Sequence, residues 1–147
     1  MPVEFERIKL GERHVSSRIT ITESHIVTFA GLTGDFNPLH MDEVAARENG
    51  YGQRIAHGML GHAVSTGLRS GIDDWDIVAF LETRRRFVAP ILAGDSVRYE
   101  AQVLELRPSR SKPFGVVKVS MQLRNQDGVT VQDGEDVFAV AMRGGVA

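Results

Sequence analysis

The spacing of apolar residues changes near the middle of the chain. Residues 22–70 carry the periodicity and capping residues of helices, whereas residues 76–142 contain strand-like apolar runs separated by turn residues. A first helix is predicted to begin after Thr22 and to end within residues 31–34, where two glycines occur. Thr22 and His25 make a poor capping box, because Glu or Gln normally occupies the second position of that motif. The apolar residues at helical spacing are Ile26, Phe29 and Ala30.

Two further helices are predicted before the strands begin. The shorter one starts at Asp42 or Glu43 and stops at the Asn49-Gly50 pair, after about Glu48. The longer one covers residues 58–70, and Gly71 follows its last turn. One face of it is expected to carry Met59, Ala63, Val64 and Leu68. Each glycine inside a helix costs about 1 kcal/mol relative to alanine, so the glycines predict that a sheet packs closely against this helix.

The second half of the chain reads as four long strands, preceded by one early strand. The last two are joined across Asp127-Gly128, which is good hairpin-turn chemistry. Antiparallel strands that follow an apolar helix favour an α+β fold in which the sheet wraps around that helix. The whole chain, residues 1–147, is interpreted as one domain. The predicted strands cover residues 14–21, 77–89, 95–106, 114–125 and 130–142.

Composition narrows the classes of partner. With 17 basic and 19 acidic residues, the chain has no charge excess of the kind that nucleic acid or an anionic membrane surface would require. It contains no cysteine, which excludes disulfides, thiolate nucleophiles and cysteine-ligated zinc. Residues 1–14 alternate charged and apolar side chains, and no apolar run approaches the roughly 20 residues of a membrane span. We therefore expect a cytoplasmic protein without a secretory leader.

The segment GDFNPLHMD, residues 34–42, concentrates chemically active side chains in a short stretch. Pro38 restricts Asn37 to non-helical geometry, so Asp35 and His40 are expected on an irregular connection between two helices. A chain that folds back over this spacing can bring a carboxylate and an imidazole to one small volume. A paired acid and base, or a couple that activates water, requires that arrangement.

The sequence Arg54-Ile-Ala-His-Gly-Met59 leads directly into the glycine-containing helix. The first turn of a helix has backbone N–H groups without intrahelical partners, and Gly58 would let a ligand approach them. Developing negative charge on a carbonyl oxygen would be stabilised there by the N–H groups and the helix dipole. This segment therefore predicts an oxyanion site.

These motifs together resemble the MaoC-like (R)-specific enoyl-CoA hydratases and dehydratases. The resemblance lies in F-A-G-L-T-G-D-F-N-P-L-H-M-D at 29–42, in Gly50-Tyr51 and I-A-H-G-M at 55–59, and more loosely in R-F-V-A-P-I-L-A-G-D at 86–95. It implies a hotdog fold, in which an antiparallel sheet wraps a long central helix. It also implies that two such domains pair edge to edge, giving a homodimer or a dimer-based oligomer. It also implies that Asp35 and His40 are the catalytic pair. Gly58 would be the oxyanion donor, and Thr66 would occupy a position where the family often has an active-site serine.

The resemblance implies hydration of a trans-2-enoyl thioester to a 3-hydroxyacyl thioester, or the reverse dehydration. The acyl carrier would be coenzyme A or acyl carrier protein, and the chemistry needs no metal, flavin or nicotinamide. His57 and Asn37 are further substrate-binding candidates, although His57 is also suited to packing or capping the turn. A hotdog thioesterase and a non-catalytic acyl-thioester binding module remain alternatives. The absence of Asp and Glu from residues 58–70 counts against the first, and intact Asp35, His40 and Gly58 count against the second.

Other polar residues carry weaker predictions. Arg84 and Arg86 should share one face of a strand, opposite Arg85, where they could bind coenzyme A phosphates. The alternative is a solvated edge or salt bridges between subunits. The basic loop 107–112 has the same ambiguity. His62 is expected in the core or an interface. The remaining predictions are surface positions for His14 and His25, a solvated turn at Asp73, Asp74 and Asp76, and no histidine spacing typical of a metal site.

Overall fold

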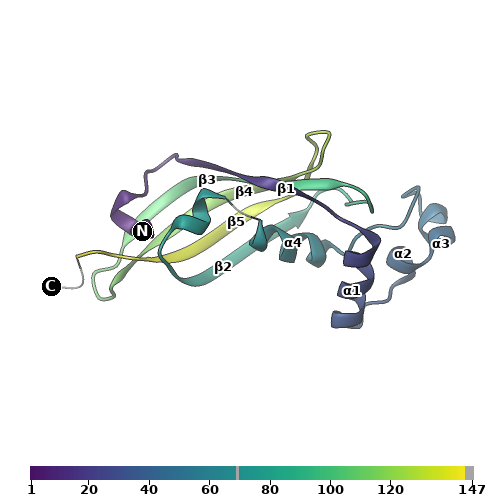
Figure 1. Cartoon of the computed structure of the whole chain (residues 1–147), viewed down its shortest axis with the longest axis horizontal. Helices are drawn as coiled ribbons and strands as arrows, with labels where there is room; N and C mark the ends of the chain where they lie inside the picture. The colour runs from purple at the N-terminus through teal and green to yellow at the C-terminus, as the bar shows by residue number, and fades with distance from the viewer. Residues whose placement is uncertain (69, 145–147) are drawn as a thin grey trace.

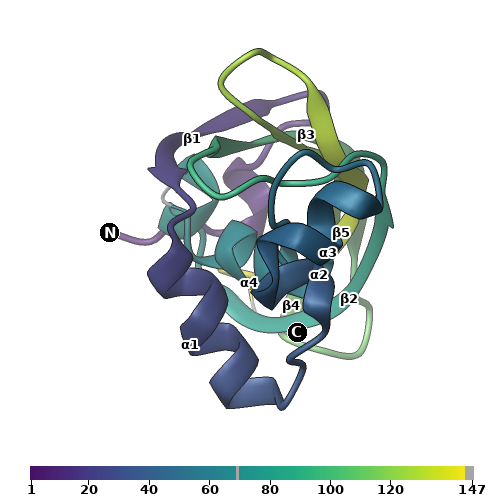
Figure 2. The same ribbon diagram turned by 90° about the vertical axis from the view of Figure 1, so that its right-hand side faces the viewer.

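The structure is a computed structural model that describes residues 1–68 and 70–144. In these residues one antiparallel sheet of five strands curves around a single helix, α4 (Gly58–Gly67) (Figures 1 and 2). The prediction of an α+β hotdog arrangement is confirmed. Each strand boundary lies within two residues of its predicted position. The strands are β1 (Arg13–Thr20), β2 (Ile77–Phe87), β3 (Ser96–Pro108), β4 (Phe114–Arg124) and β5 (Thr130–Ala141).

The strands follow the order β1-β3-β4-β5-β2, so the two edges of the sheet come from the two strands on either side of the helical region. Along β4, and along β3 as far as Val103, every second side chain is buried, as the alternation of apolar residues predicts. Hydrogen bonds between Asn125 and Val129 close the β4–β5 hairpin, and Gly128 adopts a φ of 75° there, which favours glycine. The inward-facing residues include Val97, Tyr99, Val103, Val117, Val119, Met121 and Leu123.

Helix α4 is shorter than predicted, and the predicted apolar face is only partly buried: Leu68 is buried and Val64 packs against the core. It ends at Gly67, and its buried residues are Leu60, Gly61 and Ser65, whereas Met59 is 56% exposed. The buried positions include a glycine and a serine, which a count of apolar side chains does not identify. A Cβ on Gly61 would lie 2.6 Å from Ile91 Cδ1. The prediction that glycine marks close packing is therefore right at Gly61.

The remaining helices gather beyond the start of α4, at one end of the sheet (Figure 1). They are α1 (Glu23–Thr33), α2 (Pro38–Met41) and α3 (Glu43–Glu48). The capping box at the start of α1 is complete, contrary to the sequence prediction. The backbone N–H of Thr22 donates to His25 Nδ1 at 2.9 Å, so the imidazole takes the place of the usual carboxylate. None of the described helices has the length and hydropathy required to cross a bilayer.

The prediction that His14 lies on the surface is wrong. Its side chain is buried, with Trp75 packed edge-on against the imidazole at a centroid distance of 5.3 Å. Gly71, in the 3-10 helix η2 (Gly71–Asp74), makes room for the ring, because a Cβ there would lie 2.4 Å from His14 Nδ1. His14 faces inward from the edge strand β1. The register in which β1 pairs with β3 determines which of its side chains face inward.

Candidate active site

The loop between α1 and α2 is built from short-range hydrogen bonds. Gly34 ends α1 in the left-handed conformation with a φ of 81°. Asp35 Oδ1 then accepts from the backbone N–H of Asn37 at 3.2 Å, and Asn37 Oδ1 accepts from that of Leu39 at 3.0 Å. Pro38 occupies the first turn of α2, where a missing N–H costs nothing. Asp35 lies on the irregular connection as predicted, but His40 lies on a helix that the sequence analysis did not predict.

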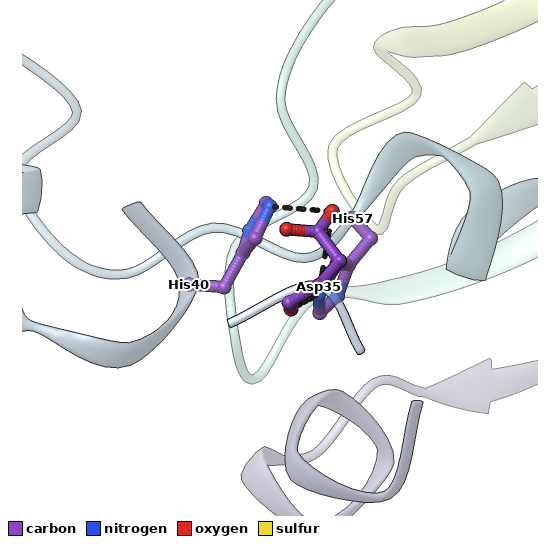
Figure 3. A group of neighbouring side chains, drawn as sticks. All are labelled: Asp35, His40 and His57. Atoms are coloured by element: carbon purple, nitrogen blue, oxygen red, sulfur yellow. Dashed lines mark hydrogen bonds and ion pairs between the residues drawn. The ribbon is translucent and has the colours of Figure 1, made fainter. Parts of the chain in front are cut away.

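Asp35 and His40 meet across a short gap. Their closest atoms, Asp35 Oδ2 and His40 Nε2, are 3.9 Å apart, and the side chains are 52% and 12% exposed, respectively (Figure 3). Nδ1–H of His40 donates to the carbonyl oxygen of Ile55 at 2.8 Å, which in a neutral ring leaves Nε2 as an acceptor. A separation of 3.9 Å exceeds that of a direct hydrogen bond, and one water molecule can bridge it.

His57 lies directly against both members of this couple. Its Nε2–H donates to the backbone carbonyl of Asp35 at 2.9 Å, and its ring stacks on that of His40 with centroids 3.8 Å apart. The His57 side chain is only 3% exposed, and the ring of Phe29 packs on it at a centroid distance of 5.0 Å. The sequence analysis gave His57 a packing or substrate-binding role, and its contact with Asp35, 22 residues away, has no local sequence signal.

The first turn of α4 presents free backbone donors beside a cavity. No acceptor for the N–H groups of Gly58 and Met59 occurs among the described residues. The carbonyl of Gly58 accepts from Nε2 of the buried Gln132 at 2.8 Å, which fixes the peptide unit. A cavity of about 310 Å³ is lined by Ile55, Gly58, Phe87 and Gln132, among other residues. His40 is linked to this cavity through its hydrogen bond to the Ile55 carbonyl, and neither Asp35 nor His40 is among the residues that line it.

The other predicted site residues are placed differently. Asn37 uses its side-chain oxygen to cap α2. Thr66 donates to the carbonyl of Ala63 at 2.7 Å and lines a separate cavity of about 270 Å³ near the end of α4. Within the described chain, the side chains of Asn37 and Thr66 form no hydrogen bond with Asp35 or His40. Their substrate-binding roles stay predictions.

Arg84 and Arg86 share the outer face of the sheet, as predicted, and both have acidic partners on β5. Arg86 forms a bidentate pair with Asp133 at 2.8 and 2.9 Å, and its hydrogen bonds lower the pKa of that carboxyl. Arg84 lies 3.4 Å from Glu135. They line a polar cavity of about 350 Å³ that does not include Gly58. Phosphate binding would compete with these ion pairs, and it stays a prediction.

Asp35, His40 and His57 each offer a possible metal-ligating atom, and these atoms lie within 4.8 Å of one another. The sequence analysis saw no such spacing, because the group forms only when the chain brings His57 under the loop. The interplanar angle of the two imidazoles is 27°, so their in-plane lone pairs run nearly side by side and do not converge on one point. Nε2 of His57 is already engaged with the Asp35 carbonyl. The arrangement suits a bridging water better than a metal ion.

A buried ion pair lies on the inner face of the sheet, next to α4. Arg85 and Asp136 are 2% and 3% exposed and meet in a bidentate pair with distances of 2.6 and 2.8 Å. Tyr99 and Thr83 donate to the same carboxylate, and His62 contacts Thr83 at 3.0 Å. Burial, followed by the Asp136 charge, raises the pKa of Tyr99 far above its usual range. Burial and then the Arg85 charge lower the pKa of His62.

Comparisons with known proteins agree with this architecture. The model of the MaoC like domain family matches residues 8–125. The (R)-specific enoyl-CoA hydratase of Rhodospirillum rubrum is 34% identical over 144 residues, which cover 95% of this chain and 93% of that protein. Protein MaoC of Klebsiella aerogenes is 35% identical over 100 residues, or 64% of this chain, and the match spans only 28% of that protein. The solved R-hydratase PhaJ1 from Pseudomonas aeruginosa has a TM-score of 0.78 at 27% identity, covering 97% of this chain and 88% of that chain.

Proposed function

Because the chain belongs to the MaoC-like domain family, we propose that it is a hydro-lyase that adds water to trans-2-enoyl thioesters. The product would be the (R)-3-hydroxyacyl thioester, and the same site would catalyse the reverse dehydration. The observation that carries this proposal is the 3.9 Å gap between Asp35 Oδ2 and His40 Nε2. Relatives with the names (R)-specific enoyl-CoA hydratase and 3-hydroxybutyryl-CoA dehydratase support the reaction class.

In this mechanism one water molecule occupies the gap between Asp35 and His40. The couple removes a proton from the water as its oxygen bonds to the electron-poor β-carbon, and the carbon–carbon π electrons move toward the thioester oxygen. The N–H of Gly58 stabilises the resulting enolate oxygen, assisted by the helix dipole. The couple then returns a proton to the α-carbon, so one water is added and no other group is consumed.

The direct test is an assay with crotonyl-CoA and longer enoyl-CoAs. We expect the absorbance of the conjugated thioester to fall and the (R)-3-hydroxyacyl product to appear. An acyl carrier protein thioester offered in parallel identifies the preferred carrier. Release of free coenzyme A without hydration would indicate a thioesterase, and binding without turnover would indicate a non-catalytic module. Either outcome would refute the proposal.

Gly58→Ala is expected to lower kcat/KM by about 10²-fold, the scale on which oxyanion donors act. The added Cβ would lie 2.8 Å from the ring of Phe87 and would obstruct the approach to the first turn of α4. Gly67→Ala is the matched control, because it lies on the same helix and its Cβ would meet open space. Steady-state kinetics on both variants measure the difference. Equal kinetics for both would argue against an oxyanion site at Gly58.

The proposed active form is a homodimer joined along β2. In the described chain β2 pairs only with β5, so the other edge of β2 has no strand partner. Many of its apolar side chains are also exposed. Such an apolar edge typically marks an interaction surface. The exposed residues on β2 and just after it are Ile77, Val78, Phe80, Leu81, Phe87 and Val88.

Leu81→Glu is expected to convert this dimer to monomers, because it buries a charge in an apolar contact. Size-exclusion chromatography with light scattering measures the mass directly. Val129→Glu, an equally exposed apolar residue beside the β4–β5 turn, is the control and should remain dimeric. A wild-type chain that is monomeric at micromolar concentration would contradict the dimer.

A further inference from the structure

We propose that His57 is the positioning residue of the Asp35–His40 couple. One of its ring nitrogens holds the backbone of Asp35, and its ring face holds the imidazole of His40. The catalytic consequence rests on the function proposed above. The geometric consequence does not rest on it, since it concerns only how firmly Asp35 and His40 are held in place.

The first half of the proposal concerns Asp35. Its side chain is half exposed and accepts only a 3.2 Å hydrogen bond from the next turn, so local contacts hold it weakly. The 2.9 Å bond from His57 Nε2–H to the Asp35 carbonyl is the long-range contact that anchors this residue to the start of α4. Without it, the loop would be free to carry the carboxylate away from His40.

The second half concerns the ring of His40. An imidazole can rotate about its last side-chain torsion between two orientations that exchange the positions of its edges. The hydrogen bond to Ile55 favours one orientation, in which Nε2 faces Asp35. The His57 ring, stacked 3.8 Å away, occupies the space through which the ring would turn. The ring of Phe29 also packs on His57, at a centroid distance of 5.0 Å, and restricts movement of the His57 ring away from His40.

The hydrogen bonds of the His57 ring also support a positioning role. Its Nε2 donates to a carbonyl, so in the neutral ring Nδ1 is an acceptor, and this atom is buried without a partner among the described residues. Asp35 is the charged group within ion-pair distance of the two imidazoles, and neighbouring Arg54 is already paired with Glu23 and Glu43. The contacts of His57 with the couple, through one ring nitrogen and the ring face, are therefore those of a positioning residue.

Two substitutions separate the two contacts. His57→Gln can keep an N–H donor near the Asp35 carbonyl but removes the ring, whereas His57→Phe keeps a ring against His40 but removes the donor. We expect each to lower kcat by about 10- to 10²-fold with a smaller change in KM, because misplacement by about 1 Å costs up to about 10²-fold. His62→Gln, on α4 and outside this cluster, is the matched control and should keep its kcat.

Nuclear magnetic resonance of the two variants tests the geometry without an assay. In the wild type we expect a sharp, slowly exchanging Nδ1–H signal from His40. His57→Gln should broaden or remove that signal, and His57→Phe should leave it while increasing amide exchange at residues 35–37. Unchanged signals and exchange in both variants would overturn the proposal. If one variant does not fold, the other still tests its own contact, and a wild type that has this geometry but no hydratase activity would refute only the proposed function.

Discussion

Asp35→Asn and His40→Gln are each expected to lower kcat by about 10²- to 10⁴-fold, the contribution typical of positioned acid–base groups. Both substitutions preserve size and remove the ability to exchange a proton with the bridging water. The folded state should survive, because Asp35 is half exposed and its Oδ1 hydrogen bond to Asn37 can still be accepted by an amide oxygen. Steady-state kinetics with crotonyl-CoA measure kcat, and circular dichroism confirms the fold.

The two losses should also be strongly non-additive. If Asp35 and His40 act on one water, removing either disables the step, and the double variant should be little worse than the single ones. Asp127→Asn, in the β4–β5 turn, and His62→Gln are matched controls that make the same chemical changes elsewhere. Near-normal kcat in both site variants would show that the couple is not catalytic.

Much of the fold was predictable because its determinants are local. The strands of the second half alternate buried and exposed residues in β3 and β4, and Asp127-Gly128 marks the hairpin. The sequence-based predictions were wrong where contacts between distant parts of the chain determine which side chains are buried. Packing buries Gly61 and Ser65 of α4, which apolar spacing does not identify. The position of His14 in the β1 register buries a polar residue that composition places on the surface.

The same distinction separates the predictable and unpredictable parts of the candidate site. Asp35 and His40 are five residues apart, and the rules for Asx turns and proline describe how the loop from Asp35 leads into Pro38, although not that His40 lies on a short helix. The free donors at Gly58 follow from the start of a helix. The contact of His57 with Asp35 spans 22 residues, and the pairing of Arg85 with Asp136 spans 51. Such contacts need the strand register and the packing of α4, which no local pattern contains.

The Arg85–Asp136 pair is expected to have the largest effect on stability. All four acceptor positions of the Asp136 carboxylate are used, since Arg85 donates to both oxygens, Thr83 to Oδ1 and Tyr99 to Oδ2. Asp136→Ala would leave the buried guanidinium without its counter-charge. We expect the free energy of unfolding to fall by about 3–5 kcal/mol, the usual cost of breaking a buried pair from one side. Urea denaturation followed by circular dichroism measures this loss.

A double variant distinguishes the cost of an orphaned charge from the value of the pair. Arg85→Met with Asp136→Leu removes both charges and keeps apolar volume, and such replacements are often neutral or stabilising. We therefore expect the double variant to recover most of the stability that Asp136→Ala loses. Arg86→Met, which breaks an exposed pair with Asp133, should leave the free energy of unfolding almost unchanged and serves as the control. A double variant as unstable as Asp136→Ala would mean that the hydrogen bonds from Tyr99 and Thr83, and not the unpaired charge, dominate the loss.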